Sequence, residues 1–296
     1  MDDSVQVYVG KHLRRNAKMQ KHKYFVFDLD ETIGSFQDLY LLCNILNFVQ
    51  RKCKKKMFEN ALHIIDDLLD LYIEFFRPGI FHILRYIHLK KKQKICDGFF
   101  IYTNNQCIPE TWAKYIMDYL EKKLKLTNLV NNIVLSFKVN NKIVETKRTT
   151  QNKIYDEFVK CVLISDQSDI CFVDNALYPK MKQDSVYYIQ PSPYYHFLSF
   201  QTILNRFFDS SIGKTFLTSM EDTKTNITKI IMEKYKQNEQ MVPLLNNAKN
   251  KNYYLDVSKK LMYHIREYIF FKNEKTPKTL KRRKNKKSGT RKCKLL

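Results

Sequence analysis

Short apolar runs alternate with longer stretches of helical spacing over the first two thirds of the chain. Four of these runs are rich in β-branched or aromatic side chains, which predicts buried strands. They cover residues 24–27, 95–103, 170–173 and 186–189. Strands that alternate with helices pair in parallel through right-handed crossovers. The pattern therefore predicts an α/β fold with an open, mainly parallel sheet flanked by helices.

The helical stretches carry apolar residues three or four positions apart. Two of them follow the first strand directly, and together they form an insert over residues 36–76. The sequence Asn140-Asn141 lies between two alternating segments, 133–137 and 142–145, and predicts a hairpin turn. Further helices are predicted over residues 80–87, 112–124, 152–161, 197–208, 227–235 and 255–271.

Composition adds boundaries to this picture. We expect a basic arm over residues 1–22, a core over 23–200, a helical C-terminal region over 201–271 and a tail over 272–296. The tail carries twelve Lys or Arg against one acid, which is half of the chain's formal charge of +22. With almost nothing to bury, it is expected to be disordered. It can bind nucleic acid, an acidic partner or an import receptor, or it can serve only as a solubilising tail.

Cysteine usage and hydropathy bear on the cellular compartment. The seven cysteines form no Cys-x-x-Cys pair, which favours reduced thiols over a disulfide framework or a zinc site. No stretch approaches the ~18 apolar residues of a membrane span, and the N-terminus lacks the apolar core of a secretory signal. We expect a soluble intracellular protein of the cytoplasm or nucleus that does not bind membranes.

The candidate chemistry begins where the first predicted strand ends. Asp28 and Asp30 follow that strand one residue apart, with Thr32 behind them. Two like charges so close destabilise each other unless a cation or a proton intervenes. One interpretation is a nucleophile and a general acid that share a metal ion. The other is a strand followed by an aspartate-rich turn.

Two further strands end in polar residues. Thr103 follows the second strand and Asp174-Asn175 follows the third. In an open parallel sheet, ligands collect at the carboxyl ends of the strands, so these positions can meet in one crevice with Asp28 and Asp30.

With a lysine before the third strand, this set resembles the four motifs of the haloacid dehalogenase superfamily, whose fold is Rossmann-like. Within it, the chain is most similar to phosphatases of the RNA polymerase II C-terminal-domain type. Asp28-Leu29-Asp30-Glu31-Thr32, Arg77-Pro78-Gly79 and Asp174-Asn175 carry that resemblance, which covers roughly residues 21–200. The lysine of the third motif is Lys153 or Lys147, and Lys153 is preferred because a helix start better directs a side chain into the crevice. A lysine-rich tail on such a core also resembles proteins of large DNA viruses, whose address would be a viral replication site.

The resemblance implies a reaction. Asp28 would attack phosphorus and form an aspartyl-phosphate, and Asp30 would protonate the leaving oxygen and then activate water. Thr103 and the lysine would stabilise the phosphoryl group. Mg²⁺ would be the cofactor. Its ligands would come from Asp28, Asp30, Asp174 and Asn175, while the substrate would contact Thr32, Asn104, Lys147 and Arg148.

The substrate is less constrained than the reaction, because the helical insert over residues 36–76 departs from the polymerase-tail phosphatases and a cap selects substrates in this superfamily. The leading hypothesis is a phosphoserine or phosphothreonine protein phosphatase. One alternative is a phosphatase for small metabolites or nucleic-acid ends. Another is a nucleic-acid-associated module that uses the core only as a scaffold.

Overall fold

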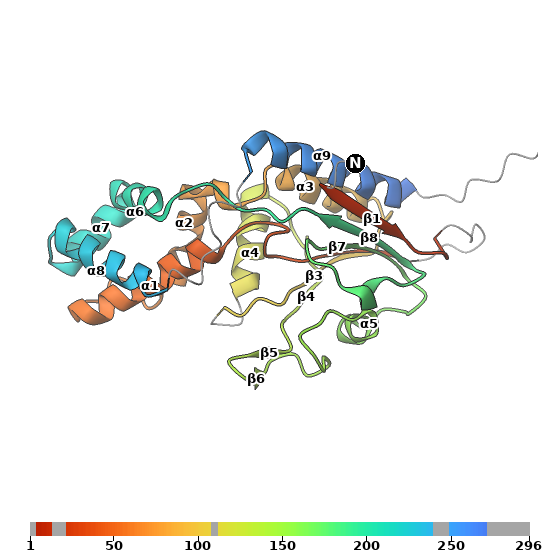
Figure 1. Ribbon diagram of the computed structural model, residues 1–296, viewed down its shortest axis with the longest axis horizontal. Coiled ribbons are helices and arrows are strands. Elements are labelled where there is room, and N and C mark those ends of the chain that lie inside the picture. The colour runs from red at the N-terminus through yellow and green to blue at the C-terminus, as the bar shows by residue number, and fades with distance from the viewer. Residues whose placement is uncertain (1–3, 14–21, 108–111, 239–248, 271–296) are drawn as a thin grey trace, which may run out of the picture.

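The computed structural model describes residues 4–13, 22–107, 112–238 and 249–270. These residues contain a six-stranded sheet at the centre of the molecule (Figure 1). Its strands are β1 (Val5–Val9), β2 (Lys23–Phe27), β3 (Gly98–Tyr102), β4 (Asn132–Val134), β7 (Asp169–Val173) and β8 (Val186–Pro191). They lie in the order β1-β8-β7-β2-β3-β4, and every neighbouring pair is parallel except β1 with β8. The prediction of an α/β fold with a mainly parallel sheet is confirmed.

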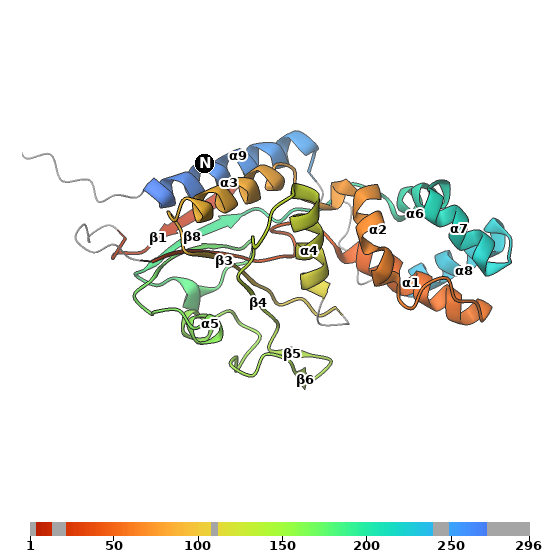
Figure 2. The same cartoon turned by 180° about the vertical axis from the view of Figure 1, so that it is seen from behind.

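Helices cover both faces of the sheet. In both views α3 and α9 lie on one side and α5 lies on the other (Figures 1 and 2). The α-helices are α1 (Gln37–Cys53), α2 (Ile65–Leu71), α3 (Ile80–Lys92), α4 (Trp112–Leu124), α5 (Tyr155–Val162), α6 (Phe200–Asp209), α7 (Ser211–Met220), α8 (Lys224–Lys236) and α9 (Lys251–Phe270). Shorter 3-10 helices are η1 (Ala61–Ile64), η2 (Ile73–Phe75) and η3 (Pro179–Met181).

Alternation along the central strand explains this layering. Phe25 and Phe27 point into the larger apolar cluster, under α3 and α9, whereas Val26 points into a second cluster with Phe158 of α5. All four side chains are fully buried. Successive side chains of a strand face opposite sides of a sheet, so a strand that is apolar throughout can be covered on both faces.

The prediction of a basic arm over residues 1–22 is wrong for Val5–Val9. These residues form the edge strand β1 and pair with β8. Val5, Val7 and Val9 pack against the core while Gln6 is exposed. This is the period-two pattern of a half-buried strand. Residues 14–21 lie outside the described residues, as does the whole tail from 271 onwards.

The hairpin prediction is correct in its turn and wrong in one of its strands. Lys138–Val139 (β5) and Lys142–Ile143 (β6) pair around Asn140 and Asn141, whose φ angles are 48° and 60°. Two positive φ angles suit asparagine at a tight hairpin turn. Asn132–Val134, however, joins the edge of the main sheet beside β3.

The insert and the C-terminal helices form one helical lobe, which we define as α1, α2, α6, α7 and α8. The two views show these helices together at one end of the molecule (Figures 1 and 2). Tyr72, after α2, donates its hydroxyl to the carbonyl oxygen of Ile203 in α6 at 2.6 Å. The second of the two helical stretches predicted in the insert, over residues 58–76, is broken into η1, α2 and η2. The predicted boundary between the core and the helical C-terminal region, at residue 200, therefore separates helices that pack together.

The last described helix, α9, lies outside the helical lobe and packs against the sheet. Tyr268 of α9 donates its hydroxyl to the carbonyl oxygen of Asp169 at 2.7 Å, and Lys23 donates its ammonium to the carbonyl oxygen of Ile269 at 3.0 Å. In the described ranges, no helix combines the length and apolar character that crossing a membrane requires.

Candidate functional site

The order of the strands in the sheet reverses between β2 and β7. From the central strand β2 it continues to β3 and β4 on one side, and later to β7 and β8 on the other. Phe27 pairs with Val173, and the backbone N–H of Asp28 donates to the carbonyl oxygen of Val173 at 2.9 Å. Asp28 and Asp174 therefore leave the sheet side by side at the switch point, where open α/β sheets bind ligands.

Lys153 joins these two aspartates. Its ammonium nitrogen lies 2.5 Å from Oδ1 of Asp28 and 2.6 Å from Oδ2 of Asp174. The lysine side chain is 1% exposed. Burial favours the neutral amine, yet Asp174 and Asp28 outweigh it and raise the pKa of Lys153 above its ordinary value. The lysine is therefore a permanent cation between the two carboxylates.

Asp30 occupies a different environment at the same site. Its Oδ2 accepts a hydrogen bond from Nδ2 of Asn105 at 2.8 Å. Burial, reinforced by the negative charge of Asp28, raises the pKa of Asp30 to about 7. A carboxyl group with a pKa close to neutrality can both donate and accept a proton, which is the requirement for general acid–base catalysis.

Glu31 is a second carboxyl group of the same loop with a perturbed pKa. Burial, and then the neighbouring Asp30, Asp28 and Asp174, raise its pKa to about 8. Its φ of 54° is unusual for a residue other than glycine. Because it is mostly protonated at neutral pH, Glu31 adds little negative charge to a site that already holds three aspartates.

The charge balance of the site leaves room for a further cation. Burial raises the pKa of Asp174 to about 7 even though Lys153 opposes the shift. One lysine therefore does not balance the three aspartates. Oδ2 of Asp28 accepts no hydrogen bond from any residue that the structure describes. Carboxylate oxygens are the donors that Mg²⁺ prefers, so the chemistry of these side chains suits a hard cation. Their arrangement is not that of a metal site, since no cluster of three or more His, Cys, Asp or Glu side chains in the described ranges has that arrangement.

These side chains line a cavity of about 680 Å³, which we call the aspartate pocket. Asp28, Asp30 and Asp174 lie in its floor with Thr103, and α1 contributes one wall. The Thr103 hydroxyl oxygen accepts the backbone N–H of Asn105 at 3.0 Å, which leaves its hydrogen available to a ligand. The pocket thus presents carboxylates, a hydroxyl donor and a nearby ammonium at one place.

Several predicted site residues lie elsewhere. Thr32 is fully buried and does not line the pocket; its hydroxyl donates to Oδ1 of Asn175 at 2.9 Å and accepts the backbone N–H of Asn175 at 3.0 Å. This pair of hydrogen bonds joins the loops after β2 and β7. It also engages the side-chain oxygen of Asn175, which was predicted as a metal ligand. Lys147 is exposed and reaches the carbonyl oxygen of Cys161, so Lys153 alone occupies the position between the aspartates.

Arg148 supports the pocket from behind and has no free face toward a substrate. It is 1% exposed. Its guanidinium donates to the carbonyl oxygens of Leu135 and Thr103 at 2.6 and 3.2 Å, and to Oδ1 of Asn104 at 2.7 Å. Asn104 lines the pocket but also donates its side-chain amide to the Tyr178 hydroxyl at 3.1 Å. The prediction of substrate contact is therefore replaced by a structural role for Arg148.

Sequence reasoning missed three residues of the site. Asn105 was part of a polar run at a strand end, which was the signal available for it. Tyr178 lines the pocket and places its ring 5.2 Å from the Lys153 ammonium, and nothing in the local sequence indicates this. Arg77, noted only for its resemblance to a family motif, is 1% exposed and donates to the carbonyl oxygens of Thr32 and Glu31, each at 2.6 Å. It holds the loop that carries Asp28 and Asp30.

Comparison of the chain with protein-family models, with curated proteins and with solved structures gave no significant match.

Proposed function

We propose that this protein is a Mg²⁺-dependent phosphomonoesterase of the haloacid dehalogenase type that works through an aspartyl-phosphate. The observation that carries the proposal is the position of Lys153, whose ammonium lies within hydrogen-bonding distance of both Asp28 and Asp174. Two carboxylates and a cation at the carboxyl ends of parallel strands would supply a nucleophile and electrostatic stabilisation for phosphoryl transfer. Asp30 and Thr103, on the same pocket floor, supply a proton donor and a phosphate ligand.

The reaction uses the residues in two steps. The Asp28 carboxylate attacks phosphorus, and the bond from phosphorus to the ester oxygen breaks while protonated Asp30 gives its proton to that oxygen. The alcohol then leaves. Water attacks the aspartyl-phosphate as the Asp30 carboxylate takes one of its protons, which releases inorganic phosphate and regenerates Asp28. Atoms, charge and protons balance over the cycle.

The other residues hold the phosphoryl group and the nucleophile. The Thr103 hydroxyl donates to a phosphoryl oxygen, and Lys153 donates to the Asp28 carboxylate and offsets charge on the transferred group. Asp28, Asp174 and the backbone carbonyl of Asp30 would hold Mg²⁺, which would neutralise charge on the phosphoryl oxygens. Asn175 contributes through its hydrogen bonds to Thr32, which fix one loop against the other.

The resemblance to polymerase-tail phosphatases points to a phosphoserine or phosphothreonine protein as substrate. Helix α1 contributes Phe36, Gln37, Tyr40 and Asn44 to the pocket wall, counting the residue just before the helix. The insert therefore borders the pocket, as a substrate-selecting cap would. Small metabolites and nucleic-acid ends carry the same reacting group, so only the wall residues separate these substrate classes.

Turnover of p-nitrophenyl phosphate by the full chain, with and without Mg²⁺, tests the proposal. We expect Mg²⁺-dependent hydrolysis that is lost in Asp28→Asn. The matched control is Asp156→Asn, which makes the same change at an exposed carboxylate of α5 and should keep wild-type turnover.

Normal turnover by Asp28→Asn would remove Asp28 as nucleophile. A folded wild-type protein that hydrolyses none of a panel of phosphopeptides, nucleotides and phosphorylated oligonucleotides would favour the non-catalytic interpretation. Trapping of the intermediate with beryllofluoride, seen as a metal-dependent rise in melting temperature that Asp28→Asn abolishes, is a second readout.

A further inference from the structure

The aspartate pocket continues along helix α1 as a groove. A second cavity of about 310 Å³ shares Gln37, Tyr40, Asn44 and Asn238 with the pocket. A third, of about 390 Å³, shares Asn47 and Arg51 with the second. Because neighbouring cavities share wall residues, they lie one after another along α1, from the aspartates toward the end of the helix. We call the two cavities beyond the aspartate pocket the α1 groove.

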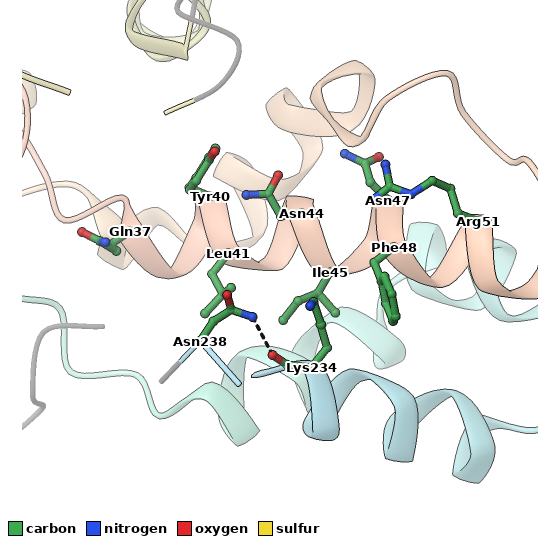
Figure 3. A pocket seen from close by; sticks show the side chains of 10 residues that line it. All are labelled: Gln37, Tyr40, Leu41, Asn44, Ile45, Asn47, Phe48, Arg51, Lys234 and Asn238. Carbon is green, nitrogen blue, oxygen red and sulfur yellow. Dashed lines mark hydrogen bonds between the residues drawn. The ribbon is translucent and has the colours of Figure 1, made fainter. Parts of the chain in front are cut away.

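One face of α1 lines all three cavities. Gln37, Tyr40, Asn44, Phe48 and Arg51 follow the three- and four-residue spacing of a single helical face. At 1.5 Å per residue, the stretch from Gln37 to Arg51 spans roughly 21 Å. Figure 3 shows Tyr40, Asn44 and Arg51 directed to one side of the helix, while Phe48 is directed toward α8. The groove is therefore long enough for a chain molecule and longer than a small metabolite requires.

The groove walls combine amides, aromatic rings and cations. Its middle section, in the described ranges, is lined by no carboxylate. Arg51 is exposed and forms no ion pair with a described residue. Lys234 of α8 lies 5.1 Å from the centroid of the Phe48 ring and donates to Oε1 of Gln237 at 3.1 Å. Two cations thus face the groove far from the reacting group.

The outer end of the groove is less positive than its sequence suggests. Lys55 pairs with Glu221 at 2.6 Å, and Lys56 pairs with Glu59. These two lysines are largely neutralised. The charge available to a ligand comes chiefly from Arg51 and Lys234, with exposed Lys54 beyond them.

These walls match single-stranded nucleic acid. Such a ligand carries a phosphate at every nucleotide and bases that stack on aromatic rings, and its binding sites pair a positive groove with aromatic side chains. Amide side chains hydrogen-bond base edges, and those of Gln37 and Asn44 are exposed in the groove. The Asn47 amide is instead bonded to Asn60 and Ala61. A peptide with one phosphate at the pocket has no charge that needs Arg51 and Lys234. The repeated charge of a polynucleotide does.

We propose that the α1 groove binds a single strand of nucleic acid whose terminal phosphate monoester enters the aspartate pocket. This inference rests on the proposed function for the hydrolysis step, while strand binding by the groove is independent of it. Tyr40, half-buried and T-shaped to Trp112 at 5.3 Å between ring centroids, is the aromatic residue that lines both the aspartate pocket and the α1 groove. Arg51 and Lys234 contact the phosphates farther along the strand.

The test compares two double charge reversals in the full chain. Arg51→Glu with Lys234→Glu removes the groove cations. Lys52→Glu with Lys229→Glu makes the same net charge change at exposed positions of α1 and α8 that do not line the groove. All proteins carry Asp28→Asn in the binding assays, so that labelled oligonucleotides stay intact. Binding is followed by fluorescence anisotropy from 50 to 200 mM salt.

We expect the groove pair to weaken binding of a single-stranded oligonucleotide at least tenfold. We also expect it to lower the salt slope by about 1.4, since each lost phosphate contact on a single strand removes roughly 0.7. The control pair should change affinity less than threefold. Equal losses in the two pairs would overturn the proposal, because binding would then follow net charge. A phosphopeptide that binds wild type as tightly as the oligonucleotide, with the same loss in the groove pair, would overturn it as well.

Turnover then connects the groove to the pocket. In proteins that keep Asp28, kcat/KM for 5′- and 3′-phosphorylated oligonucleotides is divided by kcat/KM for p-nitrophenyl phosphate. The groove pair should lower this ratio at least tenfold for the preferred end, and an unchanged ratio would refute delivery of the strand to the pocket. Oligonucleotide binding that needs the groove cations, in a wild-type protein with no phosphatase activity, would refute the proposed function while supporting strand binding.

Discussion

Replacing Lys153 by methionine removes the only positive charge that contacts Asp28 and Asp174 among the residues the structure describes. Methionine has similar length and no charge, so the packing is largely kept. The lysine is 1% exposed and lies 2.5 and 2.6 Å from the two carboxylates. Breaking a buried ion pair by removing one partner costs about 3–5 kcal/mol, because a charge stays buried without compensation. We expect the free energy of unfolding at pH 8 to fall by about that amount.

The pH dependence of this loss follows from the carboxyl groups. Burial raises the folded-state pKa of Asp174 to about 7, and without the lysine, which opposes that shift, this pKa rises further above the value of the unfolded chain. A group with a raised folded pKa stabilises the protein below its unfolded pKa, and that stability disappears as pH rises through the folded value. The Lys153 pKa is itself raised, so in wild type its contribution persists at both pH 5 and pH 8. The methionine variant should therefore lose less at pH 5 than at pH 8.

Urea unfolding at pH 5 and pH 8 without Mg²⁺ measures both quantities. The control is Lys147→Met, which makes the same change at an exposed lysine and should stay within about 0.5 kcal/mol of wild type. Adding Asp174→Asn to the methionine variant should recover part of the loss, because it removes one uncompensated charge. A loss below about 1 kcal/mol at pH 8, or equal losses at the two pH values, would refute the reasoning.

Three further predictions concern the same site. In metal-free wild-type protein, the raised pKa values of Asp30 and Asp174, about 7 against 3.8 for an ordinary aspartate, mean that stability should decline from about pH 4 to pH 7. The decline in the free energy of unfolding is at most roughly 4 kcal/mol per carboxyl group. Mg²⁺ should raise the urea midpoint more at pH 8 than at pH 5, because the carboxyl groups are ionised at pH 8. An equal rise at the two pH values would contradict this expectation. Asp30→Asn should lower kcat/KM, which reports the steps up to release of the alcohol, by about 10²–10⁴ for an alkyl phosphate and much less for p-nitrophenyl phosphate, whose leaving group needs no proton; equal losses of kcat/KM would argue against Asp30 as general acid. Thr32→Val should cost about 1–3 kcal/mol in thermal unfolding, because it leaves the partly buried backbone N–H and side-chain Oδ1 of Asn175 without their partner, and a neutral effect would show that the two loops do not depend on this contact.

The pattern of apolar runs separated by polar residues was sufficient to predict most strands of the sheet. Strands β2, β3, β7 and β8 are buried runs bounded by polar residues, and such runs are readable because burial on both faces leaves no polar position inside them. Strand β1 was missed because its period-two pattern is short and borders a basic segment. Strand β4 was assigned to a hairpin because three residues do not reveal which neighbour they pair with.

The helical lobe was beyond local reasoning. Each helix could be predicted from its own spacing, but spacing does not tell which apolar face meets which. The contact between Tyr72 and Ile203 joins segments 131 residues apart, and only the folded chain brings them together. The α1 groove has the same origin, since Lys234 comes from α8 and Arg51 from α1.

By itself, the sequence determined which residues end the central strands, and therefore that Asp28, Asp30, Thr103 and Asp174 would gather at one edge of a parallel sheet. Strand polarity is enough for that inference, because parallel strands end on the same side. The tertiary structure decided between Lys153 and Lys147 and gave Arg148 and Thr32 supporting positions behind the pocket. Those outcomes depend on burial and on hydrogen-bond partners that lie far away along the chain, which local sequence does not encode.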